Sequence, residues 1–571
     1  MSRPSHESKD TCAGPLTPIS ESTADDGRWS GAVWVGQIAL SELRDDVWRP
    51  LSDGIGFRRA RLLIWDHDQP LGSVEVPVAG GAIDLGRVRR EAMGLAGLPP
   101  QPAAGLQPPI SVMVCTRDRP EHLRKMLASL DSLDYPEFEV VVVDNNPASG
   151  LTPPVVAASA GPMIRLVDAA APGLSVARNV GLREARYDIV AFTDDDVVLD
   201  HRWLSNIAVG FARDSQVACV CGMVPTSELL TPAQEYFDRR VSWAHRWSPA
   251  VYSLRGDLDN EAAGRAADPL FPLRVSTFGT GANFAVRRDV VVSLGGFDEC
   301  LGAGAPAGSG EDVDVFLRIL LAGHLLVREP SAVVWHSHRE TVADLEDQMY
   351  GYTLGLSAWM FKLLVQPRTF AMVVSRLLVG LRHLRRITNV EQQESLPPDP
   401  ELNAVGRREL TAVARGPWAL MRGRLTGRSA TPLKSKTRLG RLFDVAAGPS
   451  AGKPARLPAG YLAAGAVALS LIGTLGALPE LPVALAVLVV GAYVLGGPGS
   501  LVLSFYPDLP GYALAALVPV VGAAVCILTV TGLLTAGFYR PTTVLLIMTL
   551  GTVVGGMLRC AFIASSAREP A

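Results

Sequence analysis

Short apolar runs alternate with amphipathic segments between residues 110 and 200 of the chain. Each apolar run is short and begins or ends at a polar residue, which predicts a buried strand. These predicted strands are residues 111–115, 139–144, 163–169 and 188–194. Two amphipathic helices are predicted between them, one from Pro120 and one around 175–186. Apolar strands that alternate with amphipathic helices predict a parallel sheet covered on both faces.

Polar residues follow three of these strands at the point where each strand ends. The three clusters are Thr116-Arg117-Asp118, Asp144-Asn145-Asn146 and Asp194-Asp195-Asp196. Because ligands of such sheets bind beyond the carboxyl ends of the strands, we expect the clusters to line one site. Like charges as close as the three aspartates resist sharing a site unless a cation lies among them.

The segments ahead of this region predict a small β-rich module at residues 29–97, without a catalytic constellation. Its strand-like segments are AVWVGQIAL, RARLLIWD and GSVEVPV, with a hairpin-like turn at 67–72. Residues 1–28 carry no apolar run, so they are predicted to be a disordered tail and not a signal peptide. The proline-rich residues 98–109 are predicted to be a linker.

The apolar region 458–566 is predicted to form about four transmembrane helices. The four stretches are roughly 461–478, 481–503, 511–535 and 542–562. Each has about 18–25 residues, enough to cross a ~30 Å hydrocarbon layer. A buried soluble bundle is the alternative, but soluble helices of this length show a polar face that is missing here. The first two stretches, separated by Leu-Pro-Glu-Leu-Pro, could form a tight hairpin or a re-entrant pair.

The chain turns basic ahead of these stretches. Between Arg407 and Arg456 there are twelve Lys or Arg residues against Glu409 and Asp444. Positive charge next to a first span marks the cytoplasmic side. We therefore expect a multi-pass protein of the cytoplasmic (inner) membrane, with its large N-terminal part in the cytosol. Residues 346–395 are predicted to be a helical segment, and residues 396–457 a basic linker in contact with lipid headgroups.

Length and composition exclude several classes of protein. A chain of 571 residues is too long for one core, so two to four domains are expected. The net charge of −3 argues against bulk nucleic-acid binding. The seven cysteines have no repeated spacing, which excludes a disulfide framework, and Cys219-Val-Cys221 lacks a second pair for zinc. The absence of Walker-type and dinucleotide-binding glycine motifs disfavours nucleotide hydrolysis and hydride transfer.

Seven motifs follow one another between residues 115 and 338. They are CTRDRP (115–120), VVVDNN (141–146), PGLSVARNVGL (172–182), FTDDDV (192–197), GTGANFAVRR (279–288), GEDVDVFLRI (310–319) and VVWHSH (333–338). This ordered set resembles the family 2 glycosyltransferases, whose α/β nucleotide-sugar-binding fold is called GT-A. The resemblance covers about 110–360, and it implies a GT-A domain with a mixed sheet at residues 110–345.

The resemblance implies a divalent cation, Mn²⁺ or Mg²⁺, as the cation among the aspartates. Asp196 would coordinate it, and His336 would supply another metal or diphosphate ligand. Such an ion bridges the donor's phosphates and stabilises the charge on the leaving oxygen. Asp194 would bind the ribose side of the nucleotide, and Asp195 would support its neighbours. A lone histidine is more often structural, but one that ends a strand in this context favours a functional role.

The same resemblance implies a set of residues that bind the nucleotide sugar. They are Thr116, Arg117, Asp118, Asp144, Asn145, Arg178, Asn179, Asp194, Asp195 and Gly281. Three of them have an alternative structural role. Asp118 and Asp144 could instead cap a helix or a turn, and Arg178 could be a surface arginine on a helix.

The acids of GEDVD begin a predicted helix and are the candidates for catalysis. Glycosyl transfer needs a base that takes the proton from the acceptor hydroxyl. In the family this base is the second acid of the ED pair, here Asp312, with Glu311 beside it. Asp314 is a third candidate, but capping and the helix dipole alone could explain it. A single base opposite the leaving diphosphate implies inversion at the anomeric carbon.

The resemblance therefore implies a membrane-anchored, metal-dependent inverting glycosyltransferase. It would move a sugar from a nucleoside-diphosphate sugar to a lipid-linked or cell-envelope glycan acceptor at the cytosolic face. A processive polysaccharide synthase is the first alternative, but its QxxRW motif is absent from DLEDQMYGYTLGLSAW, and Arg246-Trp247 precedes the ED pair. A non-catalytic glycan-binding membrane scaffold is the second, and the intact set of acids and histidine argues against it.

Overall fold

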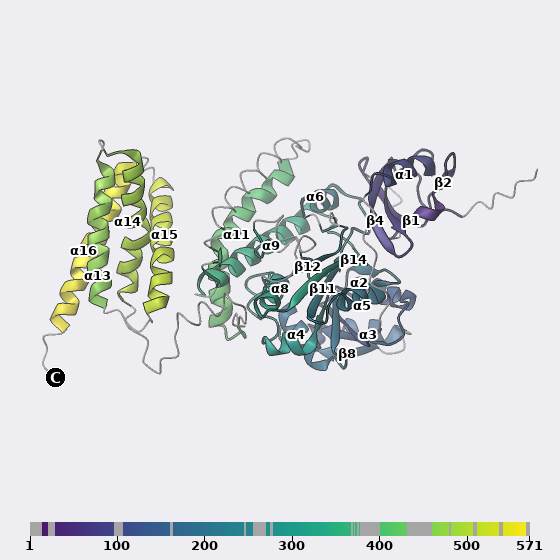
Figure 1. Cartoon of the computed structure of the whole chain (residues 1–571), viewed down its shortest axis with the longest axis horizontal. Helices are drawn as coiled ribbons and strands as arrows, with labels where there is room; N and C mark the ends of the chain where they lie inside the picture. The colour runs from purple at the N-terminus through teal and green to yellow at the C-terminus, as the bar shows by residue number, and fades with distance from the viewer. Residues whose placement is uncertain are drawn as a thin grey trace, which may run out of the picture. The chain divides into compact units, whose positions relative to one another are not determined.

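The computed structural model describes most of the chain, in two compact units (Figure 1). The described residues are 14–20, 29–95, 107–159, 164–241, 243–244, 247–254, 270–274, 278–366, 369–370, 372–373, 376, 400–430, 459–478, 481–505, 511–535 and 541–566. The first unit holds residues 1–362 and 375–442, and the second holds 363–374 and 443–571. Most of the predicted linker 98–109, and the part of the predicted basic linker after residue 430, lie outside the described residues.

Residues 29–95 form two small sheets with one α-helix. Their elements are β1 (Val33–Ala39), β2 (Trp48–Pro50), β3 (Arg59–Asp66), β4 (Gln69–Pro77), β5 (Ala82–Asp84) and α1 (Leu85–Ala92). The two sheets are β1-β3-β4 and β2-β5. β1 pairs in parallel with β3, and β3 pairs antiparallel with β4. The turn between β3 and β4 is shorter than predicted, because pairing continues to Asp66 and Gln69 and leaves only His67 and Asp68 between the strands.

Part of the predicted disordered tail is ordered against this module, so that prediction is wrong for residues 14–20. Leu16 N donates to Pro50 O at 2.9 Å, and Ser52 N donates to Leu16 O at 2.8 Å. Ile19 N donates to Val35 O at 3.1 Å. Leu16 also enters the apolar core of the module. This burial offsets the conformational entropy that the segment loses on ordering.

A nine-stranded mixed sheet forms the centre of the first unit, which confirms the predicted GT-A type of α/β fold. Its strands are β6 (Ile110–Thr116), β7 (Phe138–Asp144), β8 (Ile164–Asp168), β9 (Ile189–Thr193), β10 (Val197–Leu199), β11 (Val217–Met223), β12 (Ala250–Tyr252), β13 (Asn283–Arg287) and β14 (Leu325–His336). Their order is β10-β14-β11-β13-β9-β6-β7-β8, with β12 paired to β14. β6 to β9 pair in parallel as predicted, whereas β13 runs antiparallel between β9 and β11.

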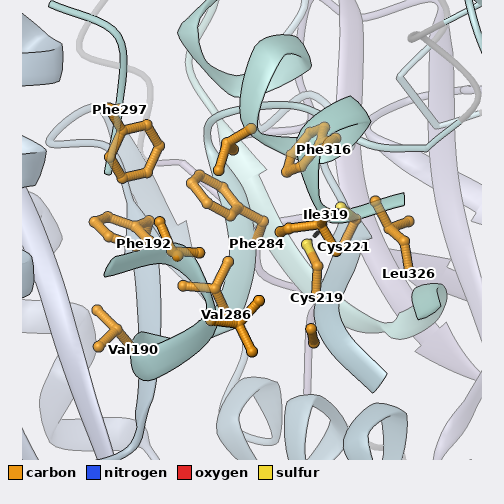
Figure 2. Packing of buried hydrophobic residues seen from close by; sticks show 14 of the residues in the cluster. Val190, Phe192, Cys219, Cys221, Phe284, Val286, Phe297, Phe316, Ile319 and Leu326 are labelled. Atoms are coloured by element: carbon orange, nitrogen blue, oxygen red, sulfur yellow. Dashed lines mark hydrogen bonds between the residues drawn. The ribbon is translucent and has the colours of Figure 1, made fainter. Parts of the chain in front are cut away.

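Helices cover both faces of this sheet. They are α2 (Pro120–Ser129), α3 (Thr152–Ala158), α4 (Leu174–Glu184), α5 (Trp203–Ala212), α7 (Arg288–Ser293) and α8 (Glu311–Leu321). Helix α6 (Pro232–Val241) packs instead against Leu345 and Met349, outside these two faces. One face packs mainly against α2, α3 and α5, and the other against α4, α7 and α8. Beneath α8, Phe192 stacks on Phe284 with ring centroids 4.9 Å apart, and Phe316 meets Phe284 edge-on at 5.3 Å (Figure 2). This close packing fixes the strand ends that carry the polar clusters.

Two long helices follow the sheet, α9 (Val342–Leu364) and α11 (Pro400–Leu425). α11 lies within residues 396–457, so the prediction of a linker is wrong for this part. Arg240 Nη2 lies 2.7 Å from Glu409 Oε2, and Arg408 Nη1 lies 2.7 Å from Asp347 Oδ1. Ala412 is fully buried on the same helix. The apolar contact orders a segment whose charge alone predicted a solvated chain.

The second unit contains four apolar helices. They are α13 (Ala459–Thr474), α14 (Val483–Leu503), α15 (Gly511–Thr535) and α16 (Pro541–Ser566). Two segments, Leu485–Leu503 and Thr542–Ile563, are long and apolar enough to cross a membrane. The segments Tyr461–Ala477 and Leu517–Ile527 are apolar but shorter. Within the described residues, two helices could therefore span a membrane, where the sequence predicted about four.

Candidate active site

The acid triplet lies in the connection between β9 and β10. β9 ends at Thr193, and Val197 of β10 pairs antiparallel with His336, the last residue of β14. Ser337 N donates to Asp196 O at 3.0 Å. Strand pairing between segments about 140 residues apart therefore places His336 beside the triplet.

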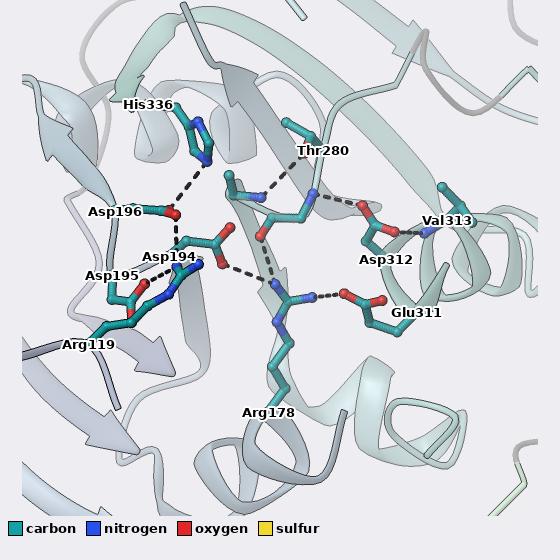
Figure 3. A network of polar contacts seen from close by, with 12 residues as sticks. Arg119, Arg178, Asp194, Asp195, Asp196, Thr280, Glu311, Asp312, Val313 and His336 are labelled. Atoms are coloured by element: carbon teal, nitrogen blue, oxygen red, sulfur yellow. Dashed lines mark hydrogen bonds and ion pairs between the residues drawn. The ribbon is translucent and has the colours of Figure 1, made fainter. Parts of the chain in front are cut away.

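Asp194, Asp196 and His336 form a group that could hold a metal ion. One ligand atom from each of the three residues lies within 4.8 Å of the others. His336 Nε2 lies 3.3 Å from Asp196 Oδ1 (Figure 3). Two carboxylate oxygens and one imidazole nitrogen form a donor set that fits Mn²⁺ or Mg²⁺. The structure thus adds Asp194 to the two metal ligands that the sequence implied.

Two arginines that sequence reasoning missed contact the triplet. Arg119 Nη1 lies 3.1 Å from Asp195 Oδ1 and 2.9 Å from Asp196 Oδ2. Arg339 Nη2 lies 3.6 Å from Asp196 Oδ2. The signal was available for Arg119, which directly follows the first polar cluster and precedes Pro120. Asp196 therefore turns Oδ1 toward His336 and Oδ2 toward the arginines.

Burial and neighbouring charges give the aspartates different proton affinities. Burial, aided by the charge of Asp196, raises the pKa of Asp194 to about 6 against the opposing effect of Arg178. Burial also acts to raise the pKa of Asp196, but His336 and Arg119 hold that pKa well below its usual range. Asp196 is therefore the more firmly ionised of these two carboxylates and the better suited to a cation.

His338, another residue that the sequence did not single out, lies against His336. The two Nδ1 atoms are 3.2 Å apart, and the ring of Phe237 packs on His338 with centroids 4.6 Å apart. Burial and the neighbouring His336 lower the pKa of His338 well below its ordinary value, which favours the neutral imidazole. A ligating histidine is commonly oriented by a partner at its other ring nitrogen. The contact of His336 Nδ1 with His338 leaves the other nitrogen of His336, Nε2, facing Asp196.

Arg178 on α4 connects the triplet to the acids of α8. Its Nη2 lies 3.5 Å from Asp194 Oδ1, and its Nη1 lies 2.9 Å from Glu311 Oε1. Nη2 also donates to Gly281 O at 3.0 Å. The side chain is 2% exposed, so the alternative of a surface arginine is wrong. The guanidinium lies 5.4 Å from the centre of the Phe284 ring, which supports it from the core.

Asp312 and Glu311 begin α8 but contact different partners (Figure 3). Asp312 Oδ2 accepts from Gly281 N at 2.8 Å, and the residue is only partly buried. Glu311 is buried against Arg178. Burial and the neighbouring Asp312 raise the pKa of Glu311 to about 7, against the effect of Arg178. Asp312 is therefore the more accessible acid of the pair.

Asp314, the third acid of this segment, belongs to a buried ion-pair network. Lys362 Nζ lies 2.7 Å from Asp314 Oδ1, and Arg318 Nε lies 2.7 Å from Asp314 Oδ2. Lys362 Nζ also lies 2.6 Å from Asp298 Oδ2, and all four side chains are fully buried. Asp314 lies in the first turn of α8, as the helix-dipole interpretation expects, and its charge is also neutralised by side chains of α8 and α9.

The aspartates at the ends of β6 and β7 have different surroundings. The carboxylate of the partly exposed Asp118 accepts from Asn146 Nδ2 at 3.0 and 2.9 Å. Asp144 is fully buried, and its Oδ1 accepts from Asn146 N at 2.9 Å in a local turn. Its Oδ2 is buried without a hydrogen-bond partner in the described part of the chain. A hydrogen-bond donor of a ligand would satisfy such an oxygen.

Three of the implied binding residues hydrogen-bond to the backbone. Asn145 Oδ1 accepts from Gly173 N at 2.8 Å, and its Nδ2 donates to two loop carbonyl oxygens at 2.9 and 2.8 Å. Asn179 Nδ2 donates to Phe297 O at 2.9 Å. Arg117 Nη1 donates to Asn145 O at 2.7 Å. These side chains hold the loops around α4, whereas Thr116 Oγ1 donates directly to Asp195 Oδ2 at 2.7 Å.

The backbone that leads into α8 rests closely on α9. Ser309 Oγ donates to Gly351 O at 3.0 Å. A Cβ added at Gly355 would lie 2.1 Å from Ser309 Oγ and 2.5 Å from Ser309 O. Among the described residues, no atom lies within 4 Å of a Cβ added at Gly351, one turn earlier on the same helix. Gly355 therefore allows α9 to approach the segment before Glu311.

Gly355→Ala is expected to destabilise the protein by about 1–3 kcal/mol, because the added methyl displaces residues 309–310 from α9. This cost opposes the ~1 kcal/mol that alanine contributes to a helix interior. Gly351→Ala is the matched control, and it is expected to be neutral or slightly stabilising. Thermal unfolding of the two variants measures the difference. Equal Tm values would contradict the close contact between α9 and the start of α8.

Comparisons with known proteins relate part of the chain to glycosyltransferases. Residues 111–293 match the family model described as Glycosyl transferase family 2. A pre-mycofactocin glycosyltransferase from Mycobacterium tuberculosis is 29% identical over 237 residues, which are 41% of this chain and 44% of that protein. The succinoglycan biosynthesis protein ExoM from Rhizobium meliloti is 29% identical over 248 residues, 41% of this chain and 69% of that protein. The chain thus spans less than half the length of the first of these relatives.

Among solved structures, the chain is similar to the mannosyltransferase PcManGT from Pyrobaculum calidifontis in complex with GDP-Man and Mn²⁺. The TM-score is 0.33 at 18% identity, covering 74% of this chain and 94% of that chain. The region matched by the family model holds Arg178, Asp194–Asp196 and Gly281, and it ends before Asp312 and His336. The chain therefore contains a domain, at residues 111–293, that matches the family 2 glycosyltransferases.

Proposed function

We propose that this protein transfers a sugar from a nucleoside-diphosphate sugar to an acceptor hydroxyl, with inversion at the anomeric carbon. The observation that carries the proposal is the position of Arg178 and Gly281 between two sets of acids. Asp194 and the metal-capable group lie on one side, and Asp312 lies on the other (Figure 3). The first set suits a charged diphosphate, and the second suits the removal of a proton. Glycosyl transfer requires both.

The residues that would hold the divalent cation, Mn²⁺ or Mg²⁺, are Asp194, Asp196 and His336. When bound, the cation neutralises the diphosphate and the charge that develops on its leaving oxygen. Arg119 holds the second oxygen of Asp196 at 2.9 Å and so keeps that carboxylate oriented. Asp195 stays with Thr116 and Arg119 as a supporting residue.

The nucleoside would lie at the ends of β6 and β7. Asp144 has a buried oxygen that a ribose hydroxyl or a base amino group can satisfy. The partly exposed Asp118 lies beside it through Asn146. Asn145 and Asn179 would act indirectly, because their amides hold the loops around α4.

Asp312 would act as the general base. It takes the proton from the acceptor hydroxyl while that oxygen attacks the anomeric carbon and the bond from this carbon to the diphosphate oxygen breaks. Gly281 N holds one oxygen of the carboxylate at 2.8 Å, which fixes its direction. Attack from the side opposite the leaving group gives the inverted product. Glu311 would fix the guanidinium of Arg178 beneath the donor sugar.

The apolar helices of the second unit support membrane anchoring as part of this proposal. We infer a multi-pass protein of the cytoplasmic (inner) membrane with the catalytic unit in the cytosol, because basic residues precede the first apolar helix. An anchor raises the effective concentration of an acceptor in the same bilayer. A lipid-linked or cell-envelope glycan is therefore the favoured acceptor.

A screen of the full-length chain against a panel of nucleoside-diphosphate sugars tests this proposal. We expect one class of donor to release nucleoside diphosphate, with lipid-linked acceptors preferred over water-soluble ones and short products. The readout is diphosphate release together with product length. Long polymer made from donor alone would support the processive synthase. Glycan binding without release from any donor would support the non-catalytic scaffold.

A further inference from the structure

Helix α11 (Pro400–Leu425) is held on the catalytic unit by one of its faces. Ala412 and Leu420 on this face are 0% and 1% exposed. A Cβ added at Gly416 would lie 2.5 Å from Ser357 Cβ on α9. Arg428, just beyond the helix, donates to three carbonyl oxygens of the catalytic unit at 3.2, 3.0 and 3.2 Å. The helix is therefore anchored and cannot turn its opposite face inward.

The opposite face of α11 exposes three large apolar side chains. Trp418 is 62% exposed, Met421 45% and Leu425 76%. At 3.6 residues per turn, their directions fall within about 60° of one another, on the side away from Ala412. Soluble proteins rarely group exposed apolar side chains without a partner. We call this set, with the basic residues that flank it, the outward face of α11.

Basic side chains flank the apolar strip on both sides. The helical period places Arg415 and Arg422 on one side and Arg424 on the other. Arg415 Nη1 donates to Tyr350 Oη at 3.2 Å. No ion pair to Arg422 or Arg424 occurs within the described ranges of the chain. An apolar centre between basic flanks is typical of a helix that lies in the interfacial layer of a bilayer.

We propose that the outward face of α11 binds an anionic lipid surface and seats the catalytic unit against it. Phosphate groups complement Arg422 and Arg424, and the apolar strip can enter the boundary between headgroups and acyl chains. A second copy fits less well, because two such faces would bring like charges together. The inference rests on the proposed membrane anchoring by the second unit. It adds a second, separate membrane contact on the catalytic unit itself.

Full-length protein in lipid nanodiscs tests the proposal. Met421→Cys is labelled with an environment-sensitive fluorophore, and the unsubstituted chain, treated in the same way, gives the background from native cysteines. In discs that contain phosphatidylglycerol, we expect a blue shift of the emission and loss of most quenching by acrylamide. Met93→Cys is the matched control. Met93 lies directly after α1 in the N-terminal module and is 77% exposed. The label at residue 93 should stay accessible.

The charge of the face is tested by Arg422→Gln/Arg424→Gln. Each basic side chain contributes about fivefold to association with an anionic surface. The double variant should therefore leave the label at residue 421 as accessible in phosphatidylglycerol discs as in phosphatidylcholine discs. In chains that keep Arg422 and Arg424, equal quenching by acrylamide of the labels at residues 421 and 93 would overturn the proposal. Shielding of residue 421 in detergent, with a dimer in sedimentation velocity, would overturn it in favour of a second copy.

The same experiment separates this inference from the proposals on which it rests. A chain that does not enter the discs would refute the anchoring and the seating of α11 together. A chain that enters the discs but leaves residue 421 accessible would refute only the seating. Release of nucleoside diphosphate, measured on the same samples, reports on the proposed activity independently of either result.

Discussion

Asp312→Asn is expected to lower kcat by about 10²–10⁴-fold, the usual contribution of a general base. Asparagine keeps the shape of the carboxylate but cannot take the proton of the acceptor hydroxyl. The geometry supports this choice of base, because Asp312 is partly exposed and Gly281 N holds one of its oxygens at 2.8 Å. Donor affinity, measured by calorimetry, should stay close to that of the unaltered protein. The effect is thus expected in turnover and not in donor binding.

Glu311→Gln separates the two acids of the pair. Glu311 lies 2.9 Å from Arg178 Nη1, so its loss should disturb the donor side of the site. We expect the KM for the donor to rise more than kcat falls. Normal turnover in Asp312→Asn, together with an inactive Glu311→Gln, would show that Glu311 is the base.

Asp196→Ala is expected to lower kcat/KM at least ~100-fold, equivalent to roughly 2.7 kcal/mol of transition-state stabilisation. Asp196 contributes one of the three ligand atoms that lie within 4.8 Å of one another. EDTA should likewise abolish turnover, and Mn²⁺ or Mg²⁺ should restore it. Titration of the purified protein with Mn²⁺ gives a second readout, because the variant should bind the ion more weakly without any substrate present.

Asp168→Ala is the matched control for this variant. Asp168 ends β8 in the same sheet, but it is exposed and lies outside the metal-capable group. The turnover of Asp168→Ala and its affinity for Mn²⁺ should equal those of the unaltered protein. Full activity in EDTA, or an unchanged Mn²⁺ affinity of Asp196→Ala, would refute the metal assignment.

Much of the catalytic fold could be predicted because its signals are local. The strands β6, β7 and β9 are buried on both faces, so each is an apolar run that stops at a polar residue at its carboxyl end. Those positions are Thr116, Asp144 and Asp194. Parallel strands end at one edge of a sheet, so the gathering of the three clusters follows from the pattern alone. The same holds for the helix predicted from Pro120, because Leu123, Met126 and Leu127 of α2 are buried on one face.

The counter-charges of the site could not be predicted in this way. His336 reaches Asp196 only because β14 pairs with β10, and its place was known from family resemblance. Arg119 and Asp196 are close because they follow the ends of two neighbouring strands, β6 and β9. Lys362 meets Asp314 across the interface between α9 and α8. Each of these pairs joins residues that no local period relates.

The sequence by itself determined a GT-A α/β domain, the acids at its strand ends and the apolar character of residues 458–566. The tertiary structure decided which side chains meet one another. It assigned Asn145 and Asn179 to the backbone of neighbouring loops, and it turned part of an apparent basic linker into α11. The physical reason is that charge pairing and apolar burial act through space over a few ångströms. Sequence patterns record only neighbours along the chain, so the inward face of α11 became visible only where it packs on the catalytic unit.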